Sequence, residues 1–140
     1  MRIMAVDFGD ARTGIAFCDP AGMLASPYCI INETDLLETL KKTAVLAKEQ
    51  KAEQIVVGYP KNMNGTIGPR AEKSRLFAEE LGKLTGIGVR LWDERCTTLS
   101  ANVYMNITDT RGKKRKAVVD ALAAAIILQD YLDFNKNTSK

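Results

Sequence analysis

The spacing of hydrophobic residues along the chain predicts where strands and helices lie. Short apolar segments, alternating or continuous and bounded by polar residues, glycine or proline, are typical of strands, and longer segments repeat at helical spacing. The pattern predicts strands at 2–7, 13–18, 25–31, 54–60 and 89–94, and helices at 35–50, 70–84, 97–106 and 117–132. Short turns join the first strands, whereas the later strands alternate with helices. This order predicts an α/β domain with a mixed five-stranded sheet, antiparallel strands first and parallel strands afterwards, flanked by helices.

One domain accounts for the whole sequence. The 140 residues are 46% hydrophobic, which is enough for one core, and no repeat, low-complexity segment or linker divides them. We therefore predict a single domain over 1–140 with a frayed tail at 135–140. No apolar stretch is long enough to span a membrane, no signal peptide precedes the first strand, and the three cysteines form no CxxC pair. We expect a reduced, cytoplasmic protein without structural zinc.

The chain contains no histidine, and this narrows the available chemistry. Ser-His-Asp and Cys-His catalysis and histidine-ligated zinc are excluded. The glycine-rich motifs of dinucleotide-binding and P-loop proteins are also missing, so we expect no nucleotide cofactor. Hydrolysis would depend on carboxylates, lysine or a metal ion. The net charge of +3 is too small to require a nucleic-acid partner, but it is compatible with one.

Carboxylates stand at the ends of three predicted elements. Asp7 ends the first strand, Asp93 and Glu94 end a later parallel strand, and Asp120 lies near the start of the last helix. If these elements are neighbours, the acids converge. Carboxylate oxygens are the ligands that Mg²⁺ prefers, and such ions support phosphodiester cleavage without histidine.

Each acid also has a plainer interpretation. Asp7 would bond to the amides of its own turn, and Asp120 would only complement the helix dipole, although its helical neighbours are nearly all apolar. Strand alternation points Asp93 and Glu94 to opposite faces, so one of them at most shares the face of Asp7. The pattern does not say which, and both would otherwise be exposed and paired with nearby arginines.

Basic and polar residues gather in the loops beside these acids. Residues 111–116 carry five positive charges just before the last helix, and the loop at 61–70 follows a strand end, where open α/β sheets bind ligands. Such runs are commonly solvated, and Thr97 and Thr98 would most simply cap a helix, but all are placed to contact phosphates. The candidate nucleic-acid-binding residues are Arg12, Lys61, Asn62, Arg70, Arg95, Thr97, Thr98, Arg111, Lys113, Lys114, Arg115 and Lys116.

Four ordered motifs cover nearly the whole chain. They are Asp7-x-Gly9-x-x-Arg12-x-Gly14, Gly58-Tyr-Pro-Lys-Asn-Met-Asn-Gly65, Asp93-Glu94-Arg95-Cys-Thr97-Thr98 and Asp120-Ala-Leu-Ala-Ala-Ala-Ile-Ile-Leu-Gln129. Together they resemble the YqgF/RuvX family, which is related to the RuvC resolvases. The resemblance implies an RNase H-like fold and a metal-dependent nuclease that processes the 5′ end of pre-16S rRNA. Older descriptions of the family assign it to Holliday junction resolution.

The resemblance also implies roles for individual residues. Carried over by position, Asp7, Glu94 and Asp120 are the catalytic and metal-binding acids, with Asp93 in reserve, and Mg²⁺ or Mn²⁺ is the cofactor. The resolvases use a second aspartate one turn later on the last helix, where this chain has Ala123. Only three acids are therefore assured, and the number of bound metal ions stays open.

Several functions compete at this point. The leading interpretation is an endonuclease for structured RNA, namely pre-16S rRNA. A resolvase of branched DNA has the same chemistry and would act as a homodimer. A catalytically silent RNA-binding module for ribosome assembly would fit the missing fourth acid. An Asp-x-Gly start also opens the sugar-kinase and actin-like ATPase folds, but those pair two such domains around the nucleotide, and this chain supplies one.

Overall fold

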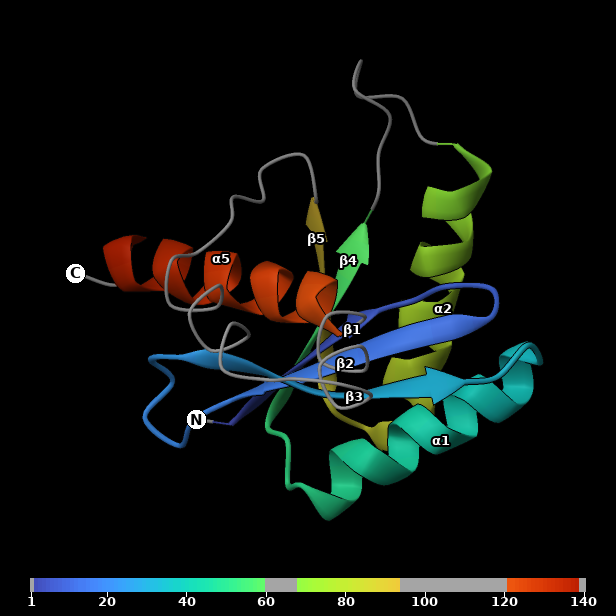
Figure 1. The fold of residues 1–140 in the computed structure, drawn as a ribbon, viewed down its shortest axis with the longest axis horizontal. Coiled ribbons are helices and arrows are strands. Elements are labelled where there is room, and N and C mark those ends of the chain that lie inside the picture. Colours follow the sequence, from blue (N-terminus) through green and yellow to red (C-terminus); the bar gives the residue numbers. More distant parts are fainter. Residues whose placement is uncertain (1, 60–67, 94–120, 139–140) are drawn as a thin grey trace, which may run out of the picture.

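The element order follows the hydrophobic pattern of the chain (Figure 1). The computed structural model describes residues 2–59, 68–93 and 121–138. In these ranges the elements are β1 (Ile3–Asp7), β2 (Arg12–Cys18), β3 (Ala25–Asn32), α1 (Leu36–Glu49), β4 (Gln54–Tyr59), α2 (Pro69–Thr85), β5 (Gly88–Asp93) and α5 (Leu122–Thr138). The helix predicted at 97–106 and the basic segment at 108–116 lie outside the described residues.

The sheet confirms the predicted mixture of strand directions. Its order is β3-β2-β1-β4-β5, with β1 antiparallel to β2 and parallel to β4. In this register Asp7 is opposite Gly14 of β2, and β5 continues the parallel half beside β4. The central position of β1 follows from its composition, because a strand that is covered on both faces is a nearly continuous apolar run.

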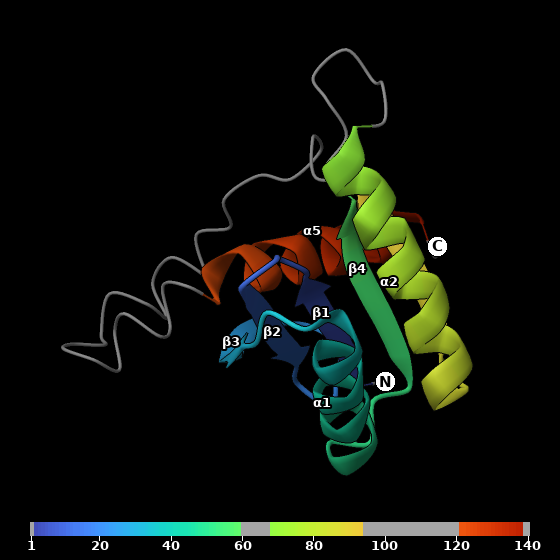
Figure 2. The same ribbon diagram turned by 90° about the vertical axis from the view of Figure 1, so that its right-hand side faces the viewer.

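Each face of the sheet has its own core. Figure 2 shows the helices that lie on either side of the sheet. On one face, Met4 and Val6 of β1 pack with residues of α1 and α2, including the buried Phe77. On the other face, Ile3 and Ala5 pack against α5. Alternation along β1 is therefore as predicted, and the residue that ends the strand, Asp7, belongs to the α5 side.

Local signals explain where the helices begin and end. The side chain of Asp35 caps α1 by accepting the N–H of Glu38, and Pro69 occupies the first turn of α2, where no N–H is needed. Helix α2 ends at Gly86, which has a φ of 71° that glycine adopts without strain. These bounds agree with the predicted helices at 35–50 and 70–84.

The last helix differs from its predicted end. We expect it to stop at 132, but α5 continues through Thr138. The frayed tail at 135–140 stays a prediction. No glycine or proline follows Leu132, and the ring of Phe134 contacts Trp92 of β5 with centroids 5.3 Å apart. That contact holds the helix against the sheet beyond the point at which its apolar period weakens.

Two smaller expectations concern the cysteines and the membrane. Cys18 is buried and Cys29 is partly buried, and both pack as small residues in or against the core, whereas Cys96 lies outside the described residues. Among the helices of the described ranges, none is long and apolar enough to cross a membrane.

Candidate active site

The C-terminal end of β1 places a single carboxylate at the edge of the sheet. Asp7 is the last residue of this central strand and is partly buried. Because Ile3 and Ala5 pack in the core beneath α5, alternation directs Asp7 to that same side. The following residue, Phe8, belongs to the core beneath α1 and α2. Asp7 and Phe8 are therefore consecutive residues that point to opposite faces of the sheet.

The surroundings of Asp7 favour its protonated form. Burial raises the pKa of the Asp7 carboxyl above its ordinary value, and the nearby Arg70 guanidinium partly offsets this effect. Within residues 2–59, 68–93 and 121–138, no hydrogen bond stabilises the Asp7 carboxylate. A carboxylate in such a position gains stability from an added cation, because a cation compensates the loss of water.

The plainer interpretation of Asp7, a carboxylate bonded to the amides of its turn, is not what the structure shows. The N–H of Gly9 points instead to Thr13 Oγ1 at 3.5 Å, and Thr13 is fully buried. The turn also needs glycine at position 9, since a Cβ there would lie 2.3 Å from the carbonyl oxygen of Arg12. The turn is closed tightly by its own backbone, and among the described residues its amides make no hydrogen bond to Asp7.

A basic pocket lies beside this turn. It has a volume of about 310 Å³ and is lined by Phe8, Gly9, Asp10, Pro69, Arg70 and Lys73. Arg70 and Lys73 lie three residues apart on α2 and hence on one face of the helix. Lys73 Nζ is 3.4 Å from Asp10 Oδ1, and both side chains are exposed. The pocket has the charge that a phosphate group requires.

Arg70 was a predicted nucleic-acid-binding residue, and Lys73 was missed. The signal for Lys73 is its helical spacing from Arg70, which becomes informative only once the helix is known to begin beside the β1–β2 turn. Arg12, also predicted, is exposed at the start of β2 and is not among the residues that line the basic pocket.

The end of β5 gives the direction of one of the two acids that the sequence left undecided. The ring of Trp92 packs on Tyr131 of α5, with centroids 5.4 Å apart, and its Nε1 donates to Asp130 Oδ2 at 2.9 Å. Val89 packs on the opposite, α1–α2 side of the sheet. By alternation Asp93 points to that opposite side, away from the side of Asp7. The role of Asp93 as the reserve acid stays a prediction.

The remaining predicted site residues lie outside the described ranges. They are Glu94, Asp120, Lys61, Asn62, Arg95, Thr97, Thr98, Arg111, Lys113, Lys114, Arg115 and Lys116. Of the three acids that the resemblance makes catalytic, the described ranges include only Asp7, and they contain no cluster of three or more metal-ligating side chains. Of the four apolar positions expected beside Asp120 on the last helix, Ala124, Ile127 and Tyr131 are buried against the sheet, and Ala123 is only partly buried.

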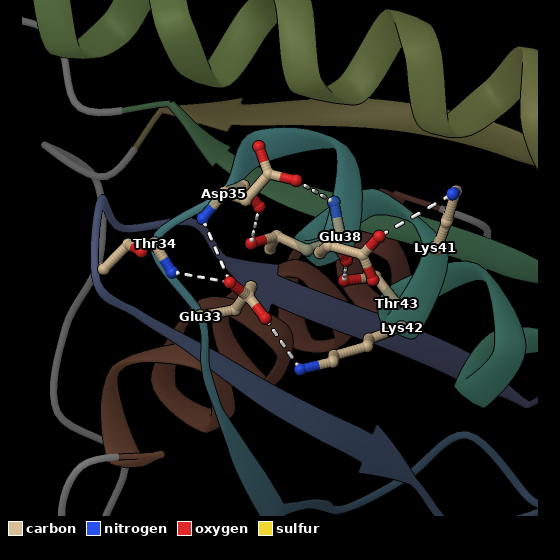
Figure 3. Close-up of polar contacts among 8 residues, drawn as sticks. Glu33, Thr34, Asp35, Glu38, Lys41, Lys42 and Thr43 are labelled. Atoms are coloured by element: carbon tan, nitrogen blue, oxygen red, sulfur yellow. Dashed lines mark hydrogen bonds and ion pairs between the residues drawn. The ribbon is translucent and has the colours of Figure 1, made fainter.

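A polar network fixes the neighbouring start of α1 (Figure 3). Glu33 accepts hydrogen bonds from Lys42 Nζ at 2.9 Å and from the amides of Thr34 and Asp35 at 3.1 Å. The Lys42 hydrogen bond, followed by that from the Asp35 amide, holds the pKa of Glu33 below its ordinary value. The N–H of Glu33 also donates to the carbonyl of Ala11 at 3.1 Å, which connects this network to the β1–β2 turn.

Relatives of similar length match the chain from end to end. A sequence model described as "RuvX: Holliday junction resolvase" matches residues 1–134. A protein of Halothermothrix orenii named "Putative pre-16S rRNA nuclease" is 44% identical over 134 residues, covering 96% of each chain. Proteins of the same name from Caldanaerobacter subterraneus subsp. tengcongensis and Listeria innocua are 42% and 46% identical, covering 99% and 95% of this chain and 100% and 98% of their own.

Solved structures of resolvases share the fold. Thermus thermophilus RuvC in complex with a Holliday junction substrate has a TM-score of 0.63 at 11% identity, covering 99% of this chain and 97% of that chain. Fowlpox virus resolvase, in complex with Holliday junction DNA, has a TM-score of 0.53 at 13% identity, covering 96% and 98%. The fold is thus RNase H-like, as the sequence motifs implied, and the chain belongs to the RuvX (YqgF) family.

Proposed function

We propose that this protein is a metal-dependent endonuclease that cleaves phosphodiester bonds in structured nucleic acid, and that its substrate is the 5′ end of pre-16S rRNA. The observation that carries the proposal is the environment of the Asp7 carboxylate. A carboxylate is held at the end of the central strand, partly buried, without a hydrogen bond from the described part of the chain and next to a basic pocket. Keeping such a group has a stability cost that a bound cation would offset.

The donor set fits Mg²⁺ or Mn²⁺. Hard divalent cations take carboxylate oxygens, and the chain has no histidine to favour softer ions. In the proposal Asp7, Glu94 and Asp120 hold the metal, which when bound supplies an activated water for attack on phosphorus. The orientation of Asp93 toward the other side of the sheet supports Glu94 as the acid from this strand.

The basic residues have a separate task in the proposal. Arg70 and Lys73 hold a phosphate of the substrate in the pocket beside Asp7, and their charge steers the strand toward the carboxylate. Arg12, Arg95 and the basic run at 111–116 contact more distant phosphates. These contacts position the substrate and carry no sequence information.

The names of the relatives favour RNA, and the family description favours DNA junctions. Resolution of a branched DNA is therefore the second candidate, and it would require a homodimer to cut two symmetric strands. In both cases the chemistry at Asp7 is the same. We expect the RNA-processing protein to work in the cytoplasm, where ribosomes are assembled.

Cleavage of two substrates tests the proposal. A pre-16S rRNA fragment with a 5′ extension and a synthetic four-way DNA junction would be incubated with wild type and Asp7→Asn in Mg²⁺ and in Mn²⁺. We expect the RNA to be cut by the wild type only. Asp133→Asn is the matched control, because it removes an exposed carboxylate of α5 and keeps the oxygen that accepts from Gln129 Nε2.

Other outcomes have distinct meanings. Retained cleavage by a pure Asp7→Asn protein would contradict the role of this carboxylate. Cleavage of the junction alone would make the resolvase the better description. Silence on both substrates with either metal would favour a catalytically silent RNA-binding module.

A further inference from the structure

The basic pocket beside Asp7 continues into a groove between α1 and α2. This second pocket, of about 220 Å³, shares Phe8, Gly9, Asp10 and Lys73 with the basic pocket. Its remaining lining residues are Thr34, Leu36 and Thr39 of the α1 side and Leu76 of α2. A single trough therefore runs from the cations at the start of α2 to a region with larger apolar side chains.

Two half-exposed leucines from different helices line this groove. Leu36 is 49% exposed and Leu76 is 47% exposed, although both line the same pocket from different helices. Phe8, which is held in the core, also lines the groove and the basic pocket. The hydroxyl of Thr39 is buried and already donates to the carbonyl of Asp35 at 2.9 Å. The groove thus offers apolar contact at its sides and a cation, Lys73, at its mouth.

The frame around the groove is fixed before any ligand arrives. Asp35 caps α1, and Glu33 bonds to the amides that precede the helix and to Lys42 (Figure 3). The bond from the Glu33 amide to the Ala11 carbonyl fixes the distance between α1 and the β1–β2 turn. Because these bonds already hold the backbone at the start of α1, ordering of that backbone would cost a ligand less affinity.

We propose that this trough is a nucleotide subsite, in which an unpaired nucleotide next to the scissile phosphate places its phosphate on Arg70 and Lys73 and its base between Leu36 and Leu76. The proposal rests on the proposed nuclease function. Asp7 and Phe8 are consecutive, with Cα atoms about 3.8 Å apart, so a strand that crosses the end of β1 reaches both the carboxylate and the groove.

The trough excludes a paired base. In a duplex the base faces are stacked and the edges are paired, so only a nucleotide that is splayed out presents its faces to two apolar walls. The contact is to base faces and hence does not select sequence. The Lys73–Asp10 ion pair at the mouth is exposed on both sides and therefore weak, so an incoming phosphate displaces it easily. The substrate class of the site is thus a strand that is unpaired beside the cleavage position.

Binding of a short fluorescein-labelled RNA without divalent metal tests the subsite. The same strand would be used alone and annealed to its complement, with fluorescence anisotropy as readout, so that no cleavage is needed. We expect the wild type to prefer the single strand, and the double variant Leu36→Ser with Leu76→Ser to bind it about tenfold more weakly, with the duplex unaffected. Lys73→Gln should weaken both forms, because a phosphate contact does not depend on pairing.

The chain offers a closely matched control. Leu37→Ser with Leu84→Ser removes two leucines from the same two helices, which are 57% and 46% exposed and do not line the groove. This control should bind the single strand like the wild type. Equal losses in both double variants, or no loss in the groove variant, would overturn the proposal.

A second measurement uses the unaltered protein. Single-stranded RNA containing 4-thiouridine would be photo-crosslinked to the wild type and the attached peptides identified. Crosslinks within residues 34–39 or 73–76 are expected, and crosslinks only elsewhere would overturn the subsite. If the binding and crosslinking results hold but the wild type cleaves no nucleic acid with any metal, the nuclease proposal fails and the groove remains a nucleotide-binding site.

Discussion

The ring of Phe8 is stacked on the ring of Phe77, with centroids 4.5 Å apart and planes inclined by 18°. Phe8 follows the carboxylate at the end of β1, and Phe77 is fully buried in the middle of α2. The stack therefore connects the candidate site to the helix that carries Arg70 and Lys73. Stacking adds to the apolar burial of both rings.

Loss of this stack should destabilise the whole domain. Phe77→Ala removes a fully buried ring and leaves a cavity, so the free energy of unfolding should fall by about 3–5 kcal/mol. Urea denaturation measures the change. Leu84→Ala on the exposed side of the same helix is the control, with an expected change below about 0.5 kcal/mol. If the free energy of unfolding fell equally in the two variants, the stack of Phe8 on Phe77 would make no special contribution to stability.

The turn after β1 should tolerate no side chain at position 9. In Gly9→Ala the new Cβ would meet the Arg12 carbonyl at 2.3 Å, and the backbone must move to relieve it. We expect a loss of about 1–3 kcal/mol, measured by thermal or urea unfolding. Gly88→Ala is the comparison, because nothing lies within 4 Å of a Cβ there. A stable Gly9→Ala protein would show that the turn adapts freely.

Gln129 should be a sensitive position on α5. Its side chain is buried, its Oε1 accepts the Ala25 N–H at 2.9 Å, and its Nε2 donates to the Met23 carbonyl at 3.2 Å. Gln129→Leu fills the space but leaves the Ala25 N–H without its partner. We expect a loss of about 1–3 kcal/mol in the free energy of unfolding. Asp133→Asn, which keeps an oxygen for Gln129 Nε2, should change little, and calorimetry compares the two variants.

At neutral pH and without metal, the ionised carboxylate of Asp7 should lower the free energy of unfolding. The folded state raises the pKa of Asp7 by burial, so it binds this proton more tightly than the unfolded state. The free energy of unfolding therefore falls as the pH rises from the ordinary aspartate pKa through the raised one. Asp7→Asn, which stays uncharged, should melt at a higher temperature than the wild type at pH 7 in EDTA.

Two comparisons complete the Asp7 prediction. The advantage of Asp7→Asn should vanish at a pH below the ordinary aspartate pKa, where the wild-type carboxyl is protonated in both states. Adding Mg²⁺ or Mn²⁺ at pH 7 should raise the melting temperature of the wild type and leave that of Asp7→Asn unchanged, since binding to the folded state stabilises it. Equal melting curves of the two proteins in EDTA at every pH would contradict the prediction.

The sequence predicted the elements well because each carries its own local signal. The capping Asp35, the proline at the start of α2 and the glycine at its end mark the helices, and continuous apolar runs mark β1 and β4. The end of α5 was missed because the contact that extends it, between Phe134 and Trp92, joins residues far apart in the chain.

The candidate site also contains features that local sequence signals predict and features that depend on contacts between distant residues. Alternation along β1 is confirmed by Ile3 and Ala5, which pack on the α5 side, and it assigns Asp7 to that side. It left Asp93 and Glu94 undecided, because the direction of β5 side chains depends on which helix covers each face. The packing of Trp92 on Tyr131 gives the direction of Asp93 by alternation, and Glu94 lies outside the described residues. The groove between α1 and α2 was not predictable at all, because Leu36 and Leu76 become neighbours only through the tertiary fold.

The separation of the core into two halves has a consequence for synthesis on the ribosome. The half beneath α1 and α2 is built from residues that all precede the end of β5, whereas the other half needs Ile127, Leu128 and Tyr131 to cover Ile3 and Ala5. A nascent chain can therefore close one side of its sheet early, but the other side stays open until the last helix emerges. Premature termination would leave a half-covered sheet with its apolar face exposed to aggregation.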